Sequence, residues 1–256
     1  MTHDSSATYK RFRMAPATSA WLILCVFFVL SVGLFVVLLR ETYQSYQDAM
    51  RTADGAILRG HVTAGVVLQE PRSLTSRTIE RLPGSLDPCP DSDDVCVPLN
   101  IGNRIKTLPA AGYGPVASLV LPDATHIQLW AQGTGSDIVY RTYQVSRWTN
   151  RRQIVNLQQN AGYARYDIAD SHAYQRVEYS VTLANNVKIW LSPGGSYSIN
   201  VIPDDPALRS DVQFELAVRS GNATVERDGV TVQVAEAQIV EVTRANEIRP
   251  PRTATW

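Results

Sequence analysis

Arginine and aromatic side chains gather in one short stretch of this sequence, YRTYQVSRWTNRRQ, which covers residues 140–153. Arginine, tyrosine and tryptophan concentrate binding energy at interfaces, and they also stack on sugars or pair with carboxylates. The stretch therefore predicts a contact site for a partner. An alternative is that its aromatic rings point into a core and its arginines are merely solvated. The candidate residues are Arg141, Tyr143, Arg147, Trp148, Arg151 and Arg152.

Residue types that perform catalysis occur, but not in a recognisable arrangement. Ser171 and His172 are neighbours, yet no serine lies in a glycine-flanked nucleophile motif of the hydrolase type. Two carboxylates for glycoside cleavage need a set separation, which only the fold can provide. No zinc-finger, Walker A, dinucleotide-binding or HExxH motif is present. We expect a protein that is not an enzyme and that uses no metal or cofactor.

The bulk composition is that of a folding chain without excess charge. Of its 256 residues, 45% are hydrophobic and 19% charged, and 24 basic residues balance 24 acidic ones for a formal net charge of +0. Nucleic-acid-binding proteins usually carry a basic excess, so DNA and RNA are not expected as partners.

One segment is long and apolar enough to cross a membrane. WLILCVFFVLSVGLFVVLL, residues 21–39, contains no charge, and a helix of that length spans roughly 28 Å. A cleaved signal peptide is the alternative, but its apolar part would be shorter and would end at a small-residue cleavage site, whereas this run continues as LLRETYQ. The sequence predicts a transmembrane helix over residues 20–39 that contacts the lipid bilayer through residues 21–39.

Basic residues before the span favour a cytoplasmic N-terminus. Lys10, Arg11 and Arg13 precede it, and the positive-inside rule then places the C-terminal domain outside the membrane. We expect a short cytoplasmic tail over residues 1–19. Residues 40–55 show no strand alternation and are expected to continue the helix as a stalk.

From residue 56 onward, short segments alternate between apolar and polar residues, with turn residues between them. This pattern predicts an all-β domain over residues 56–243, a jelly roll or β-sandwich-type roll built largely from antiparallel pairs. Asp228-Gly229 favours a two-residue type I′ turn, which would pair Arg227 with Val230 and, farther along, Ala223 with Val234. One face of this hairpin is then apolar.

Two segments depart from this alternation. Residues 70–98 are rich in proline and are expected to form an insertion closed by a disulfide between Cys89 and Cys96, the alternative being two free thiols. Residues 244–256 contain Pro250-Pro251, which cannot continue a sheet, and are expected to form a flexible or extended tail.

The order of several phrases resembles the extracytoplasmic domain of the FecR family of regulators over roughly residues 56–243. The phrases are LNIGNRIKT (99–107), ASLVLPDATHIQLW (117–130), QIVNLQQNAGYARYDI (153–168), VEYSVTLANNVKIWLSPGGSYSINV (177–201) and ELAVRSGNATVERDGVTVQVAEAQIVEV (215–242). The resemblance implies a FecR-like β domain on a single-pass membrane anchor.

The sequence also departs from the family pattern. Alanine replaces the family's glycine in Asp123-Ala124-Thr125, and Ala235-Glu236-Ala237 stands where a glycine usually precedes the last strand. Members of the family carry a cytoplasmic domain that binds a sigma factor, and about 19 residues before the span are too few for a folded domain. We therefore expect the anti-sigma role not to carry over.

These observations favour a membrane-anchored, extracytoplasmic FecR-like domain for binding, sensing or scaffolding in envelope signalling. Its expected partner is a protein or an envelope polysaccharide. One alternative is a structural accessory subunit of a larger membrane complex, in contact with its other subunits. A further alternative is an envelope carbohydrate-active enzyme, which would need a cleft with two facing carboxylates.

Overall fold

A computed structural model describes most of the chain and divides it into two units, which meet between Ala49 and Met50. The described residues are 16–53, 55–61, 65–71, 76–78, 94–109, 114–170, 173–183, 187–203, 211–245 and 247–254.

The first unit contains one continuous helix, α1 (Pro16–Asp48). Its stretch from Ala20 to Asp48 is long and apolar enough to cross a membrane. A helix satisfies its own backbone hydrogen bonds, as lipid requires. The helix continues beyond the apolar run, which ends at Leu39, and it stops at Asp48. The stalk predicted over residues 40–55 is therefore helical only as far as Asp48. Residues Met50–Thr52 form strand β1 instead.

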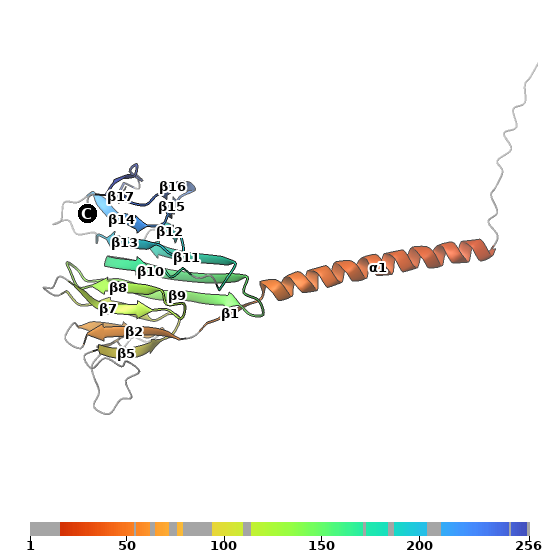
Figure 1. The fold of residues 1–256 in the computed structure, drawn as a ribbon, viewed down its shortest axis with the longest axis horizontal. Helices are drawn as coiled ribbons and strands as arrows, with labels where there is room; N and C mark the ends of the chain where they lie inside the picture. The colour runs from red at the N-terminus through yellow and green to blue at the C-terminus, as the bar shows by residue number, and fades with distance from the viewer. Residues whose placement is uncertain are drawn as a thin grey trace, which may run out of the picture. The chain divides into compact units, whose positions relative to one another are not determined.

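The second unit is built from strands in two sheets, which confirms the predicted all-β fold (Figure 1). The first sheet, sheet A, contains in order β4 (Ser76–Thr78), β3 (Val66–Gln69), β6 (Arg104–Thr107), β9 (Asp137–Ser146), β10 (Arg152–Asp167), β11 (Arg176–Leu183), β12 (Lys188–Leu191), β15 (Ala223–Arg227) and β16 (Val230–Val234). Strand β1 pairs with the outer end of β9.

The second sheet, sheet B, contains in order β5 (Asp94–Leu99), β2 (Ala56–His61), β7 (Pro115–Val120), β8 (His126–Trp130), β10, β13 (Ser196–Val201), β14 (Val212–Ser220), β17 (Gln238–Thr243) and β18 (Arg252–Thr253). Among the described pairings of both sheets, β10 with β11 is parallel and the others are antiparallel.

Strand β10 belongs to both sheets and runs through the middle of the domain (Figure 1). Its first half pairs with β9 and β11, and its second half pairs with β8 and β13. Buried and half-buried residues alternate along it except at Asn160 and Ala161, where the alternation slips by one residue. Gly162 follows with a φ of 79°, a conformation that favours glycine. This slip transfers the strand from one sheet to the other.

The hairpin of β15 and β16 has the predicted register. The five pairs run from Ala223 opposite Val234 to Arg227 opposite Val230. Asp228 and Gly229 have φ angles of 47° and 80°, as a type I′ turn requires. The apolar face is covered at its inner end, where Val234 is fully buried, whereas Val230 beside the turn is 57% exposed.

The predicted insertion over residues 70–98 contains part of sheet B. Strand β5 pairs with β2 along its whole length and includes Pro98, which is opposite Ile57. Cys96 is a buried residue of β5, but Cys89 lies outside the described residues. The disulfide therefore stays a prediction.

Of the two predicted forms of the C-terminal tail, flexible or extended, residues 247–254 have the extended one, and they pack against the sheet. β18 pairs with β17, and the amide of Ala254 donates to the carbonyl of Ala237 at 2.8 Å. The side chains of Arg249 and Arg252 both bind the carboxylate of Glu241. Proline is tolerated here because β18 lies at the edge of the sheet, where a missing donor disrupts no central ladder.

Candidate binding groove

A row of side chains crosses the outer face of sheet A over four neighbouring strands. Gln69 of β3 is the Cα partner of Arg104 of β6, Arg104 is the partner of Val139 of β9, and Val139 is the partner of Gln158 of β10. Directly opposed residues of adjacent strands present their side chains on the same face. The sheet register alone therefore brings together residues that are up to 89 positions apart in the sequence.

Two β-bulges add further polar residues to this row. The register between β9 and β10 shifts between Asn156 and Leu157, which leaves Arg141 as an extra residue of β9. A second shift leaves Asn160 as an extra residue of β10. A bulge changes the direction of the side chain that it inserts. Arg141 and Asn160 consequently lie on either side of Gln158 on the outer face.

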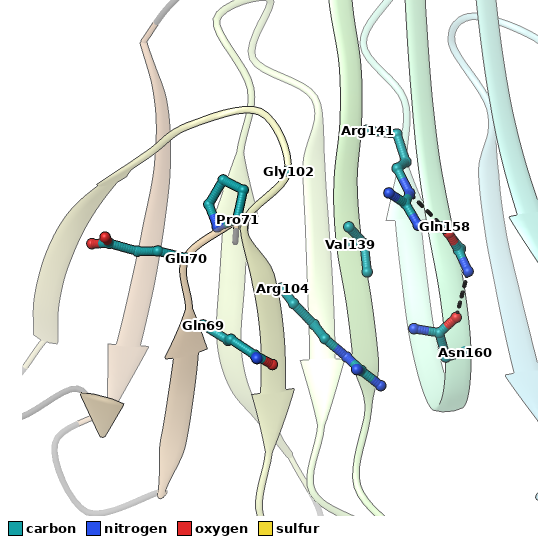
Figure 2. Close-up of a pocket in the computed structure, with 9 residues that line it drawn as sticks. All are labelled: Gln69, Glu70, Pro71, Gly102, Arg104, Val139, Arg141, Gln158 and Asn160. Carbon is teal, nitrogen blue, oxygen red and sulfur yellow. Dashed lines mark hydrogen bonds between the residues drawn. The ribbon is translucent and has the colours of Figure 1, made fainter. Parts of the chain in front are cut away.

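These residues form a groove with a volume of about 380 Å³. One wall comes from Glu70 and Pro71, which follow β3. Pro71 lies over the turn at Gly102, where an added Cβ atom would be 2.9 Å from Cβ of the proline. Gly102 also has a φ of 92°, so both the space and the backbone conformation require glycine. The lining residues are Gln69, Glu70, Pro71, Gly102, Arg104, Val139, Arg141, Gln158 and Asn160 (Figure 2).

A chain of hydrogen bonds holds the polar side chains of the groove in place. Nε of Arg141 donates to Oε1 of Gln158 at 2.8 Å, and Nε2 of Gln158 donates to Oδ1 of Asn160 at 2.7 Å (Figure 2). Nδ2 of Asn160 donates to Oδ1 of Asp137 at 3.3 Å, and Nε of Arg104 donates to the same oxygen at 2.8 Å. The far wall of the groove is therefore preorganised before any ligand arrives.

The two arginines of the groove differ in their charge balance. The guanidinium of Arg104 makes two contacts with the carboxylate of Asp137, and the hydrogen bond raises the pKa of Arg104. Arg141 is exposed and binds the neutral amide of Gln158, and no ion pair with it occurs among the described residues. The side chain of Glu70 points away from Arg141 (Figure 2). Within the described part of the chain, the guanidinium of Arg141 therefore presents a positive charge that is not ion-paired.

The sequence predicted six residues as contacts for a partner. One of them, Tyr143, is a core residue instead. Its side chain is 2% exposed, and its hydroxyl group accepts a hydrogen bond from Nε2 of Gln153 at 3.3 Å. Burial and the nearby charge of Asp123 raise the pKa of Tyr143 well above its usual value. The predicted contact of Tyr143 with a partner is therefore corrected: strand alternation turns this ring into the interior.

The other five candidates lie at two separate places. Arg141 belongs to the groove. Arg147, Trp148 and Arg151 lie in the connection between β9 and β10, and all three are exposed. The guanidinium carbon of Arg147 is 4.8 Å from the centre of the Trp148 ring. Arg152, at the start of β10, donates two hydrogen bonds, of 3.0 and 2.9 Å, to the carboxylate of Glu178. The structure thus divides the predicted patch.

A second cavity, of about 840 Å³, lies beside β1. Arg51, Asp123, Asp170 and Tyr174 are among its lining residues, together with the edge of Tyr143. Asp123 has a structural role, because its carboxylate accepts hydrogen bonds from the amide of Thr125 at 3.1 Å and from Nε2 of Gln153 at 2.6 Å.

The groove lacks the pair of carboxylates that glycoside cleavage needs, whereas the second cavity has two carboxylates, Asp123 and Asp170, among its lining residues. Glu70 is the one carboxylate among the nine residues that line the groove, so two facing carboxylates are not found there. Within the described part of the chain, no three His, Cys, Asp or Glu residues are placed to hold a metal ion. The groove is instead suited to binding.

Sequence reasoning did not identify Arg104, Gln158 or Asn160. Gln158 and Asn160 were visible only as polar positions in the phrase NLQQN, and their separation of two residues is typical of any solvated strand face. The bulges and the four-strand register, which give these residues a common site, leave no signal in a single sequence.

Comparisons with known proteins show that part of this chain is similar to two solved structures. No family model matches the chain, and no curated protein matches it. Two crystal structures of a proposed anti-sigma factor from Parabacteroides distasonis are similar to part of it. One, at 1.65 Å resolution, is 16% identical, covers 54% of this chain and 55% of its own, and has a TM-score of 0.39. The other, at 2.50 Å resolution, is 15% identical, covers 59% of each chain and has a TM-score of 0.40. The matches thus span little more than half of each chain, and the resemblance to the FecR family stays a prediction.

Proposed function

We propose that this chain is a membrane-anchored domain outside the membrane that binds an envelope polymer and acts in signalling or scaffolding without catalysis. The polymer that suits the groove is a polysaccharide carrying carboxylate groups. The observation that supports this proposal is the guanidinium of Arg141, which binds the neutral Gln158 and has no ion pair among the residues that the structure describes. A guanidinium recognises a carboxylate well, because its planar donors match the two oxygens.

The remaining groove residues are suited to hydrogen bonding with the hydroxyl groups of a sugar. Besides the hydrogen bonds described above, the amides of Gln158 and Asn160 each have a second N–H, and the carbonyl oxygen of Asn160 has a second lone pair, which match the acceptor and donor of a hydroxyl group. The apolar lining consists of Pro71 and Val139, and no aromatic ring is among the nine lining residues. The groove provides hydrogen bonds and charge instead.

The anchor and the groove together suit a sensor or a scaffold. The helix α1 would keep the domain beside the membrane, where extended envelope polymers are concentrated. The groove is an open surface row rather than a closed pocket, so a polymer can lie across it without a free end entering. Such a site binds a repeating ligand without changing it.

A cosedimentation experiment tests this proposal. Full-length protein in detergent micelles is mixed with an insoluble acidic envelope polysaccharide, and the bound fraction is measured. We expect Arg141→Ala to weaken binding about tenfold, because the variant lacks one group that forms charge-assisted hydrogen bonds with the polymer. Lys188→Ala is the matched control, since Lys188 is a cation on another strand of sheet A, 3.8 Å from the Trp190 ring centre.

Two outcomes would contradict the proposal. An equal loss in the Arg141 and Lys188 variants would mean non-specific attraction to positive charge. Retention of integral membrane proteins in fixed stoichiometry, with no retention on the polymer, would favour the alternative of an accessory subunit in a membrane complex. Chemical reduction of the polymer's carboxyl groups to alcohols should abolish binding by the unmodified protein if the carboxylate is what Arg141 recognises.

A further inference from the structure

The connection between β9 and β10 carries a second cluster of exposed arginines, apart from the groove. Residues 147–151, Arg-Trp-Thr-Asn-Arg, form this connection, which we call the arginine-tryptophan tip. Trp148 is 54% exposed, and the guanidinium of Arg147 lies against its ring. No acidic residue occurs between positions 138 and 166 of the sequence. The tip thus combines positive charge with an exposed amphipathic ring.

The carboxylate of Glu178, in the neighbouring strand β11, binds two arginines that lie outside the tip. Glu178 of β11 is bound by both Arg152 and Arg176, and these contacts lower the pKa of its carboxyl group. The amides of Gln175 and Arg176 donate to carbonyl groups of Asn150 and Arg151, both at 2.9 Å, so Arg176 lies beside the tip. Arg152 and Arg176 thus add two further arginines next to the tip.

The sequence places the tip close to the point where the chain leaves α1. The helix ends at Asp48, β1 begins at Met50, and Ala49 alone separates them. Met50 is the Cα partner of Ser146, the residue that directly precedes the tip. Consecutive Cα atoms are about 3.8 Å apart. The arginine-tryptophan tip is consequently tied within a few residues' length of the helix end.

The length of α1 limits how far this point can lie from lipid. The apolar run ends at Leu39, and nine helical residues follow to Asp48, which gives about 14 Å of helix. The headgroup layer of a bilayer occupies about 5–8 Å of that length, and any tilt of the helix shortens the remaining gap. The end of α1 at Asp48 therefore lies only a short distance beyond the headgroups.

We propose that the arginine-tryptophan tip docks on the membrane that α1 spans, with Arg147 and Arg151 at the phosphate groups of anionic lipids and Trp148 in the interface. Tryptophan favours this depth because its ring is apolar and its N–H is polar. Each arginine near an anionic surface contributes electrostatic attraction that salt weakens. The proposal rests on α1 as a membrane anchor but not on the groove or its ligand.

Fluorescence quenching in nanodiscs tests this docking. Full-length protein is reconstituted in phosphatidylcholine with or without phosphatidylglycerol, and lipids brominated near the headgroup serve as quenchers. The difference between wild type and Trp148→Phe isolates the emission of Trp148. With phosphatidylglycerol, we expect quenching of that emission by about twofold, as for a ring at the interface. Replacing both arginines of the tip by serine, or raising the salt concentration, should remove most of the quenching.

Trp190→Phe is the matched control, since Trp190 on β12 also stacks with a cation, Lys188, but belongs to another part of sheet A. The difference in emission between wild type and Trp190→Phe gives the emission of Trp190, which the brominated lipids should not quench. Unchanged Trp148 emission in both membranes would overturn the proposal, as would quenching that neither anionic lipid nor salt alters. A circular dichroism melt verifies that each variant is folded. Arg141→Ala should leave the quenching intact, which separates this result from the polysaccharide test.

Discussion

Two alanines in turns of the β domain have a backbone conformation that suits glycine, and replacing them should stabilise the protein. Ala124, between β7 and β8, has a φ of 65°, and Ala237, between β16 and β17, has a φ of 59°. Both are positions where the sequence departs from the glycine of the FecR-like pattern. In the left-handed region, the Cβ atom of an L-residue approaches the following carbonyl oxygen, at a cost of about 1–2 kcal/mol.

Backbone hydrogen bonds hold both alanines in this conformation. The amide of Ala124 donates to the carbonyl of Leu121 at 3.0 Å, and the amide of Leu121 donates to the carbonyl of Thr125 at 2.9 Å. The amide of Ala237 donates to the carbonyl of Val218 at 2.9 Å. Relaxing φ at either alanine would break these bonds, so the strain persists in the folded state.

Ala124→Gly should therefore raise the free energy of unfolding by about 0.5–1 kcal/mol. Relief of the strain exceeds the added entropy of glycine in the unfolded chain, which costs about 0.4–1 kcal/mol. Ala124 is exposed, so the lost methyl group removes little packing. For a domain of this size, the midpoint of thermal unfolding should rise by about 2 °C. Ala237→Gly should act in the same direction, and the two effects should add.

Thermal unfolding of the full-length protein in detergent, followed by circular dichroism, measures this change. Ala235→Gly is the matched control, because Ala235 is exposed in the same turn as Ala237 but does not have a positive φ. The control should lower the midpoint, since only the unfolded-state entropy changes. A decrease in all three variants would refute the reasoning, because it would mean that the alanines carry no relievable strain.

Two further predictions concern the C-terminal residues and the bend of β10. Glu241→Gln should destabilise the domain by about 1 kcal/mol at neutral pH, since Arg249 and Arg252 both bind this carboxylate and lower its pKa. A lowered folded-state pKa stabilises the protein above the ordinary value of 4.5, so the difference between wild type and variant in chemical denaturation should vanish as acid protonates Glu241. A difference that does not change with pH would contradict this. Gly162→Ala should cost about 3 kcal/mol, because its Cβ atom would be 2.1 Å from the carbonyl oxygen of Gly135 at a φ of 79°. An unchanged urea midpoint would exclude that contact.

Local sequence was sufficient for the class of fold and for elements whose partners are close in the chain. The hairpin of β15 and β16 is an example, because Asp228-Gly229 selects the turn and one register alone gives an apolar face. The helix α1 is another, since its apolar length is a property of consecutive residues. The alanines at 124 and 237 were also visible in the sequence, as departures from a glycine pattern.

The candidate site depended on contacts between distant segments. Arg141 was identified by residue type, but its position in the groove comes from a bulge and from the pairing of β9 with β10, which insert it beside Gln158. Tyr143, two residues along, has the same interface-forming character, and it is buried because strand alternation there faces the core. The C-terminal residues packed against β17 despite two prolines, through arginines that meet Glu241.

The sequence by itself determined that this chain forms one apolar helix followed by alternating strands, because hydrophobic periodicity and turn chemistry act between neighbouring residues. Only the tertiary structure decided which polar side chains share a surface. Strand register and bulges depend on the packing of both sheets at once, and a shift of one residue reverses the face on which every side chain of a strand lies.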